Sequence, residues 1–375
     1  MTRTYAIGDM LNRRYRVEYL LSTDGAMSQI LKAKDKLAQL KDTTDPSIEV
    51  ANPRYDSIVL VKQADYSGFI DPAEAPDERE RTRKSLQNSF DLEILATTEN
   101  KRGSPNFVEN LVMGFDSFQI GDDSYLVMEF LEGKTLEKVI QELTTLPGSN
   151  RPHTQVSSVS EYQGVKIAFE MAAVLEYLHQ FQGGLIHRDI KPSNVMLSPN
   201  GNLTDCVKVY DLGISEKKKK SNKTMLLGIA AGSPFFAAPE QYAPNGAIPK
   251  SDVYSLGAVL LYTLLGNNHP MDPVDITASE PLKPYIGKLA VVRKNLSHRV
   301  LEMIQKMTLK DISMRWDSTM AREYLGQHLQ HLKASESQSA HLEYLAVSEH
   351  LGINHKPVAD PHQRYMQMAK NLGIY

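Results

Sequence analysis

The stretch His187-Arg188-Asp189-Ile190-Lys191-Pro192-Ser193-Asn194 is the most informative part of the 375-residue sequence. A short apolar run, 195–197, follows it directly. A second polar triplet, Asp211-Leu212-Gly213, lies 22 residues after Asp189 (211 minus 189) and directly after the strand-like run 207–210. Asp, Asn and Pro are also common turn residues. Taken alone, either stretch could therefore be an ordinary Asx-rich turn without a catalytic role.

The side chains in these two stretches are the types that phosphoryl transfer requires. Such a reaction needs a group that orients the attacking hydroxyl, oxygen ligands for magnesium, and cations that offset phosphate charge. Asp189 is able to orient a hydroxyl and accept its proton, and Lys191 to neutralise charge on the transferred group. Asn194 and Asp211 supply the hard oxygen ligands that magnesium prefers.

The composition is ordinary for a globular protein and excludes several classes. With 41% apolar and 23% charged residues, the chain has ample material for a core. A formal net charge of -3 provides no overall basic surface, so we do not expect nucleic-acid binding. The single cysteine, Cys206, excludes an internal disulfide and a cysteine-built zinc site. We also expect a cytoplasmic protein, because no apolar run has the length of a signal peptide or a membrane span.

The hydrophobic pattern changes along the chain from strand-like to helical. Runs 15–21, 29–33, 57–62, 111–118 and 124–130 predict strands, the polar stretch 35–56 predicts a loop insertion, and 85–97 predicts a helix behind the charged segment 77–84. Later segments predict helices, namely 165–178, 253–265, 297–307 and 319–332. A sheet-rich part followed by a helix-rich part predicts two unequal lobes with a cleft between them.

These motifs together resemble the eukaryotic-type, or Hanks-type, serine/threonine protein kinase family, and bacterial members in particular. Residues 187–194 resemble the catalytic loop H-R-D-x-K-x-x-N, and Asp211-Leu212-Gly213 resembles the metal-binding triplet. The resemblance implies an α+β, bilobal protein-kinase-like fold. Its N-lobe is a small antiparallel β-sheet with one main helix, and its C-lobe is larger and mostly α-helical. It also implies transfer of the γ-phosphoryl group of ATP to Ser/Thr hydroxyls of protein substrates, with Mg²⁺ as the metal and Mn²⁺ as an alternative.

Further matches follow in the order of the family. Val59-Leu60-Val61-Lys62 resembles the V-A-I-K strand, which implies that Lys62 pairs with the nucleotide phosphates and that Glu93 holds this lysine. Taken alone, Lys62 and Glu93 would more often be surface charges. Arg315 matches the arginine that pairs with the glutamate represented by Glu240, and we expect a buried, structural ion pair there.

The resemblance also implies a set of nucleotide-binding residues. Met128 matches the gatekeeper of the hinge, and the backbones of Glu129 and Leu131 match the groups that bind adenine. The complete set implied for the nucleotide is Gly25, Ser28, Ile30, Leu60, Lys62, Met128, Glu129, Leu131 and Leu197.

The sequence differs from the family pattern at two places that affect nucleotide binding. The glycine-rich loop reads Thr23, Gly25 and Ser28 at its three glycine positions, with a one-residue shift as the alternative register. Glycine matters there because the backbone must approach the phosphates closely. Leu60 replaces the usual alanine above the adenine ring. A pseudokinase scaffold or allosteric binding module with weak or no turnover therefore remains the alternative, and a small-molecule phosphotransferase is disfavoured by Ala238-Pro239-Glu240.

Several smaller signals complete the prediction. Arg188 beside the catalytic aspartate predicts regulation by phosphorylation of the activation segment, with Ser221 and Thr224 preferred on position. His328 with His331, and His350 with His355, lack a nearby carboxylate or cysteine framework for a metal and are expected at the surface.

The expected domain organisation is an N-terminal segment, 1–13, a kinase domain, 14–328, and a helical C-terminal extension, 329–375. The lobes should meet near residues 130 and 131. The extension should pack on the kinase domain or dock a partner.

Overall fold

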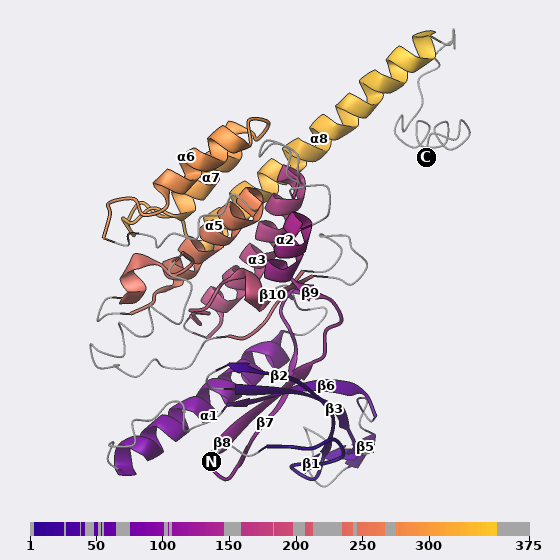
Figure 1. Cartoon of the computed structure of the whole chain (residues 1–375), viewed down its shortest axis with the longest axis vertical. Helices are drawn as coiled ribbons and strands as arrows, with labels where there is room; N and C mark the ends of the chain where they lie inside the picture. Colours follow the sequence, from indigo (N-terminus) through magenta and orange to yellow (C-terminus); the bar gives the residue numbers. More distant parts are fainter. Residues whose placement is uncertain are drawn as a thin grey trace.

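The computed structural model describes residues 4–25, 28–37, 39–41, 49–51, 54, 56–64, 76–100, 104, 107–145, 159–182, 184–197, 207–212, 235–242, 246–266, 275 and 277–350. The chain forms two lobes, a β-sheet lobe at the bottom of Figure 1 and a helical lobe above it. This arrangement agrees with the expected bilobal α+β fold. None of the helices in these ranges is both long and apolar enough to cross a membrane.

The N-lobe is built on a six-stranded antiparallel sheet with the order β1-β2-β3-β6-β8-β7. Its strands are β1 (Met10–Leu11), β2 (Tyr15–Gly25), β3 (Ser28–Asp35), β6 (Ile58–Ala64), β7 (Gly114–Ile120) and β8 (Asp123–Glu129). A separate hairpin of β4 (Gln39–Lys41) and β5 (Glu49–Ala51) lies within the stretch expected to be a loop insertion. The expectation of a loop was wrong for residues 39–41 and 49–51, which pair as antiparallel strands.

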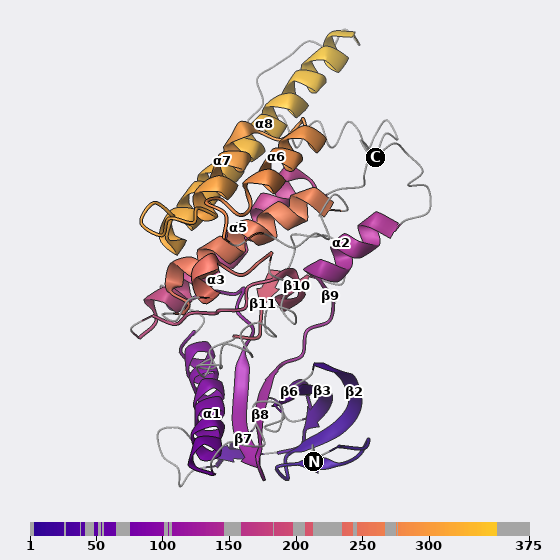
Figure 2. The same cartoon turned by 60° about the vertical axis from the view of Figure 1, so that its left-hand side comes forward.

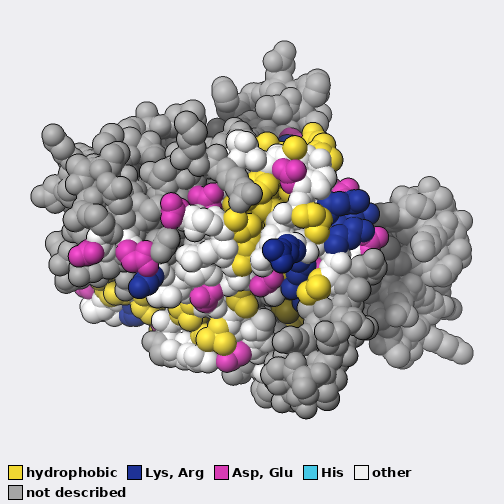
Figure 3. All heavy atoms as spheres, turned by 90° about the horizontal axis from the view of Figure 1, so that it is seen from below, with side chains coloured by type: hydrophobic (Ala, Val, Ile, Leu, Met, Phe, Trp, Pro, Cys, Tyr) yellow, Lys and Arg dark blue, Asp and Glu magenta, His cyan; other side chains and the backbone are white. Residues whose placement is uncertain are grey.

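The two faces of the sheet have different partners because side chains alternate along a strand. Val59 and Val61 are fully buried on the outer face. There, a ladder of aromatic rings packs across the strands, with Phe118 stacked 5.9 Å from Tyr15 and 5.0 Å from Tyr125. Figure 3, which looks at the molecule from below, shows a band of hydrophobic side chains beside a group of Lys and Arg side chains.

The inner face of the sheet packs against α1 (Pro76–Glu99). Phe90 and Thr97 are buried on this helix, as the helical pattern predicted, and the helix also includes the charged segment expected to precede it. Gly114 allows the close approach of α1 to β7, since a Cβ there would lie 2.7 Å from Ile94 Cδ1 and 2.8 Å from Thr97 Oγ1. The Gly114 N–H donates to Thr97 Oγ1 at 3.0 Å, which ties the strand to the helix.

The C-lobe is formed by α2 (Leu136–Thr145), α3 (Glu161–Gln180), α5 (Pro249–Leu265), α6 (Lys283–Val292), α7 (His298–Met307) and α8 (Ser318–His350), with the short strands β9 (Lys134–Thr135), β10 (Val195–Leu197) and β11 (Val207–Val209) at its junction with the N-lobe. Its core is one large cluster of buried side chains centred on α3 and α5. Every residue from Ser251 to Leu261 in α5 is buried, as expected for a helix that is apolar nearly all round.

The last helix, α8, extends past the expected end of the kinase domain and runs without interruption to His350. Figures 1 and 2 both show its C-terminal part projecting beyond the other helices. At its start, Trp316 stacks on Tyr324 at 4.5 Å, and α8 contacts α3, α5 and α7. Residues 351–375 of the predicted extension lie outside the described residues.

His328 contradicts the prediction that the histidines lie at the surface. It is 1% exposed, and its Nε2 lies 2.6 Å from Glu161 Oε1 at the beginning of α3. The same carboxylate accepts hydrogen bonds from the hydroxyl and the backbone N–H of Ser297, the N-cap residue of α7. Three helices therefore meet at Glu161, which sequence spacing alone does not reveal.

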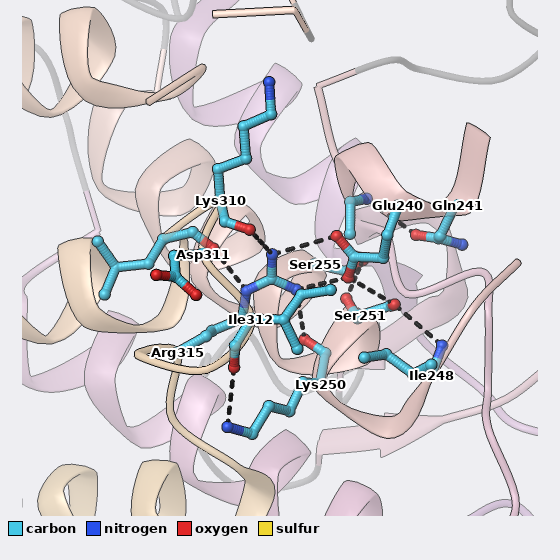
Figure 4. Close-up of polar contacts among 12 residues, drawn as sticks. Glu240, Gln241, Ile248, Lys250, Ser251, Ser255, Lys310, Asp311, Ile312 and Arg315 are labelled. Carbon is cyan, nitrogen blue, oxygen red and sulfur yellow. Dashed lines mark hydrogen bonds and ion pairs between the residues drawn. The ribbon is translucent and has the colours of Figure 1, made fainter. Parts of the chain in front are cut away.

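Arg315 and Glu240 form a buried ion pair in the C-lobe, as expected (Figure 4). The Arg315 side chain is fully buried and donates to Glu240 Oε1 at 2.6 Å and Oε2 at 3.1 Å. It also donates to the carbonyl oxygens of Leu309 at 2.6 Å and Lys250 at 3.0 Å. The Ser251 hydroxyl donates to Glu240 as well, so each polar atom around the guanidinium has a partner.

We predict that Arg315→Met destabilises the protein by about 3–5 kcal/mol, because it leaves the shielded Glu240 carboxylate without its cation and removes a donor to the Leu309 and Lys250 carbonyl groups. Denaturant unfolding measures the loss. Arg322→Met is the matched control, since Arg322 is 43% exposed in its pair with Glu176 and should contribute about 1 kcal/mol or less. Equal losses for the two variants would contradict the structural role of Arg315.

Candidate active site

The loop 187–194 is anchored by a buried carboxylate in the first turn of α5. Asp252 is 1% exposed and accepts the backbone N–H groups of His187 and Arg188, each at 2.8 Å. The imidazole Nε2 of His179 lies 3.0 Å from the same carboxylate. Arg188 has a positive φ of 68°, a conformation that a non-glycine residue adopts only when its surroundings hold it there. The stretch that begins with Asp252, residues 252–257, also resembles a C-lobe signature of the family, but sequence spacing alone does not predict these backbone hydrogen bonds.

Asp189, Lys191 and Asn194 converge on one side of this loop. Lys191 Nζ lies 2.9 Å from Asp189 Oδ2. Asn194 Nδ2 donates to the Asp189 carbonyl oxygen at 2.8 Å and to its Oδ2 at 3.1 Å. Nearly half of the Asp189 side chain (46%) is exposed, so the carboxylate is held in a fixed orientation and still accessible to a substrate.

Strand pairing brings Asp211 to the same place. β10 and β11 form an antiparallel pair in which Val195 is opposite Val209. The Tyr210 N–H then donates to the Asn194 carbonyl oxygen at 3.2 Å, and the Tyr210 hydroxyl donates to the Ser193 carbonyl oxygen. Asp211 follows directly, with a positive φ of 62° that turns the chain away from the strand.

Lys62 reaches Asp211 from the N-lobe and forms an ion pair with its Oδ1. Burial alone would lower the pKa of the Lys62 amine, but the charge and hydrogen bond of Asp211 outweigh it and raise this pKa. Burial would likewise raise the pKa of Asp211, and the charge of Lys62 lowers it. Both groups are therefore ionised at neutral pH.

Glu93 does not form the ion pair with Lys62 that the resemblance implies; among the described residues, Lys62 pairs with Asp211. Glu93 is 7% exposed, and its carboxylate accepts the backbone N–H of Leu212. Burial, followed by the nearby charge of Asp211, raises the pKa of Glu93 to about 8. The carboxyl is therefore largely protonated at neutral pH, as expected for a buried acid whose neighbouring lysine is paired with Asp211.

Asn194 and Asp211 are the pair that could hold a divalent cation. Both amide hydrogen atoms of Asn194 are directed at Asp189, so its amide oxygen is the remaining ligand atom. The Asp211 side chain is 34% exposed. No group of three or more His, Cys, Asp or Glu side chains in the described part of the chain is arranged to hold a metal. The donor set thus matches a hard cation that takes its other ligands from water or phosphate.

Three of the residues expected around adenine, Ile30, Leu60 and Met128, lie on the inner face of the N-lobe sheet. Ile30 lies opposite Lys62 between β3 and β6, and Leu60 lies opposite Met128 between β6 and β8. Leu60, Met128 and Leu131 belong to one apolar cluster. The Glu129 N–H donates to the Met113 carbonyl oxygen at 2.8 Å, so this N–H is already engaged within the N-lobe.

The three remaining residues predicted to bind the nucleotide lie in two different parts of the structure. Gly25 and Ser28 lie opposite each other where β2 meets β3, and the residues between them lie outside the described ranges. Leu197, in contrast, is only 2% exposed and belongs to the C-lobe core, so the structure does not bring it to the other predicted residues. Because successive side chains alternate, the half-buried Met196 lies on the opposite face of β10. On a short apolar strand such as β10, sequence pattern alone does not show which of two neighbouring residues, here Met196 and Leu197, faces away from the C-lobe core.

Comparison with known proteins places the chain in a family. The family described as "Protein kinase domain" matches residues 79–328, and the chain belongs to this family. Among curated relatives, the probable serine/threonine-protein kinase PknB of Lactococcus lactis is 26% identical over 280 residues, which cover 72% of this chain and 41% of the relative. Serine/threonine-protein kinase PknL of Mycobacterium tuberculosis is 34% identical over 213 residues, covering 56% of this chain and 48% of the relative.

The chain thus spans less than half the length of these curated relatives. Among solved structures, the kinase domain of Mycobacterium tuberculosis PknI is similar, with a TM-score of 0.56 and 18% identity over 86% of this chain and 98% of that domain. This structural likeness supports the protein kinase fold inferred from the two lobes.

The raised pKa of Glu93 predicts a specific pH dependence of stability. Between about pH 4.5 and pH 8 the folded chain retains a proton that the unfolded chain has released, so the free energy of unfolding falls as pH rises through this window. Glu93→Gln remains neutral at every pH. Its melting temperature should match that of the wild type near pH 5 and exceed it by roughly 3 °C or more near pH 9.

Glu302→Gln provides the control, because Glu302 lies on the exposed face of α7. Thermal unfolding without nucleotide at several pH values makes the comparison. A Glu93→Gln advantage that is independent of pH, or shared by Glu302→Gln, would contradict a protonated Glu93.

Proposed function

We propose that the chain is a serine/threonine protein kinase that transfers the γ-phosphoryl group of ATP to protein hydroxyls. The observation that carries the proposal is the convergence of Lys62 from the N-lobe with Asp211 from the C-lobe, beside Asp189, Lys191 and Asn194. A lysine, two aspartates and an asparagine at the lobe junction match the needs of phosphoryl transfer, in which positioning and charge stabilisation supply most of the catalysis.

Each of these residues has a distinct role in the proposed reaction. Asp189, oriented by Asn194, accepts the proton of the attacking hydroxyl, and Lys191 offsets charge on the transferred group. Asn194 and Asp211 would hold Mg²⁺, with Mn²⁺ as the alternative; the metal supplies charge neutralisation at the phosphates. Lys62 would exchange Asp211 for phosphate oxygens when nucleotide binds.

The test is phosphate transfer from labelled ATP and magnesium to a generic basic protein. We predict that Asp189→Asn lowers the rate by roughly 100-fold or more, because it removes the proton acceptor and leaves the shape of the side chain nearly unchanged. Mapping by mass spectrometry should find the phosphate on Ser and Thr. No transfer by the wild-type chain, or transfer that survives Asp189→Asn, would contradict the proposal.

We further propose that phosphorylation of the activation segment regulates the enzyme. Arg188 is positioned next to Asp189, where a bidentate arginine contact would order a phosphorylated segment. The preferred sites, Ser221 and Thr224, lie outside the described residues. The double substitution Ser221→Ala/Thr224→Ala should lower both activity and phosphate content after incubation with ATP. Full activity with unchanged phosphate content would contradict this regulation.

A further inference from the structure

The end of β8 and β11, the strand that precedes Asp211, are joined by a third segment, residues 110–113. The Val209 N–H donates to the Asn110 carbonyl oxygen at 2.7 Å, and the Val112 N–H donates to the Val209 carbonyl oxygen at 3.1 Å. The Asn110 side chain donates to the Val207 carbonyl oxygen at 2.8 Å. Figure 2 shows β11 at the lobe junction, above the upper ends of β7 and β8. These bonds attach β11 to the chain that enters β7.

One carboxylate completes the connection to β8. Glu129 Oε2 lies 3.3 Å from Lys208 Nζ on β11 and accepts the Met113 N–H at 3.4 Å. The Glu129 N–H in turn donates to the Met113 carbonyl oxygen at 2.8 Å. The Lys208 and Glu129 side chains are only 13% and 30% exposed, so solvent screens their attraction less than it would at an open surface.

The side chains of these segments differ in how well they are packed. Leu111, Val207 and Val209 are buried in the C-lobe core, whereas Met113 and Lys208 are only partly buried. Leu111, Met113 and Lys208 line a hollow of about 440 Å³ on this side of the molecule. Side chains that border open space gain fewer dispersion contacts than side chains in a filled core. At Met113 and Lys208 packing therefore contributes less, and the ion pair and hydrogen bonds help to hold β11 in position relative to Glu129.

We infer that Glu129 and Lys208 form a positioning pair that sets the distance between the two ends of the nucleotide site. The backbone of Glu129 lies at the adenine end, and Asp211, three residues after Lys208, lies at the metal end. The inference rests on the proposed function, because it assigns these two ends to one bound nucleotide. Neither side chain of the pair needs to touch the nucleotide.

The pair predicts a selective effect on ATP. Lys208→Met and Glu129→Gln should each raise the KM for ATP about 5- to 10-fold, with kcat within about twofold and the KM for the protein substrate unchanged. Lys208→Arg keeps the charge and should retain most of the affinity. The exchanged pair Glu129→Lys/Lys208→Glu should recover part of the loss, because it restores opposite charges at the two positions. Comparing the single variants with the double variant measures the interaction between the two groups.

Lys166→Met is the matched control. Lys166 pairs with Glu170 on α3 at a similar exposure, 28% and 18%, and lies away from the nucleotide site, so its loss should leave the KM for ATP unchanged. Hydrogen exchange provides a readout that needs no catalysis: Lys208→Met should speed exchange in segments 207–212 and 110–113 and leave α5 unaffected.

Direct binding of magnesium-ADP, measured by titration calorimetry, separates failure of the inference from failure of the proposed function. Weaker binding by Lys208→Met than by Lys166→Met supports the pair even if Asp189→Asn disproves the kinase assignment. Equal nucleotide binding by wild type, Lys208→Met and Glu129→Gln would overturn the inference. A parallel rise in the KM values for ATP and for protein substrate would also overturn it, because that pattern indicates general loosening.

Discussion

The ion pair between Lys62 and Asp211 is the contact on which the site depends. Lys62 lies on β6, a central strand of the N-lobe sheet, and Asp211 lies just after β11 in the C-lobe. The pair therefore brings together residues from both lobes. A lysine and an aspartate this shielded stabilise each other's charged forms and would be costly to leave unpaired.

Glu93 illustrates the consequence of that pairing. With Lys62 engaged by Asp211, the buried Glu93 has no cation of its own and retains a proton near neutral pH. A bound metal and nucleotide would compete for Asp211 and release Lys62, and the freed charge would favour the ionised form of Glu93. The proposed catalytic arrangement and the nucleotide-free arrangement thus differ in which carboxylate holds one lysine.

Much of this fold could be predicted from sequence because hydrophobic periodicity and motif order are local signals. The strands around Lys62, the buried α5 and the Arg315–Glu240 pair followed from those signals. The partner of Lys62, the burial of His328 and the burial of Leu197 did not. Each of these depends on distances between segments far apart in the chain, and the choice between two carboxylates depends on burial energies that spacing cannot provide.

The most direct test of the account is calorimetric titration of wild type and Asp211→Asn with magnesium-ADP, each with and without the metal. If Lys62 and Asp211 share a metal–nucleotide site, magnesium should strengthen nucleotide binding to the wild type, and Asp211→Asn should abolish that strengthening while remaining folded. Binding that is equally strengthened by magnesium in both proteins would contradict the convergence of these side chains on the nucleotide.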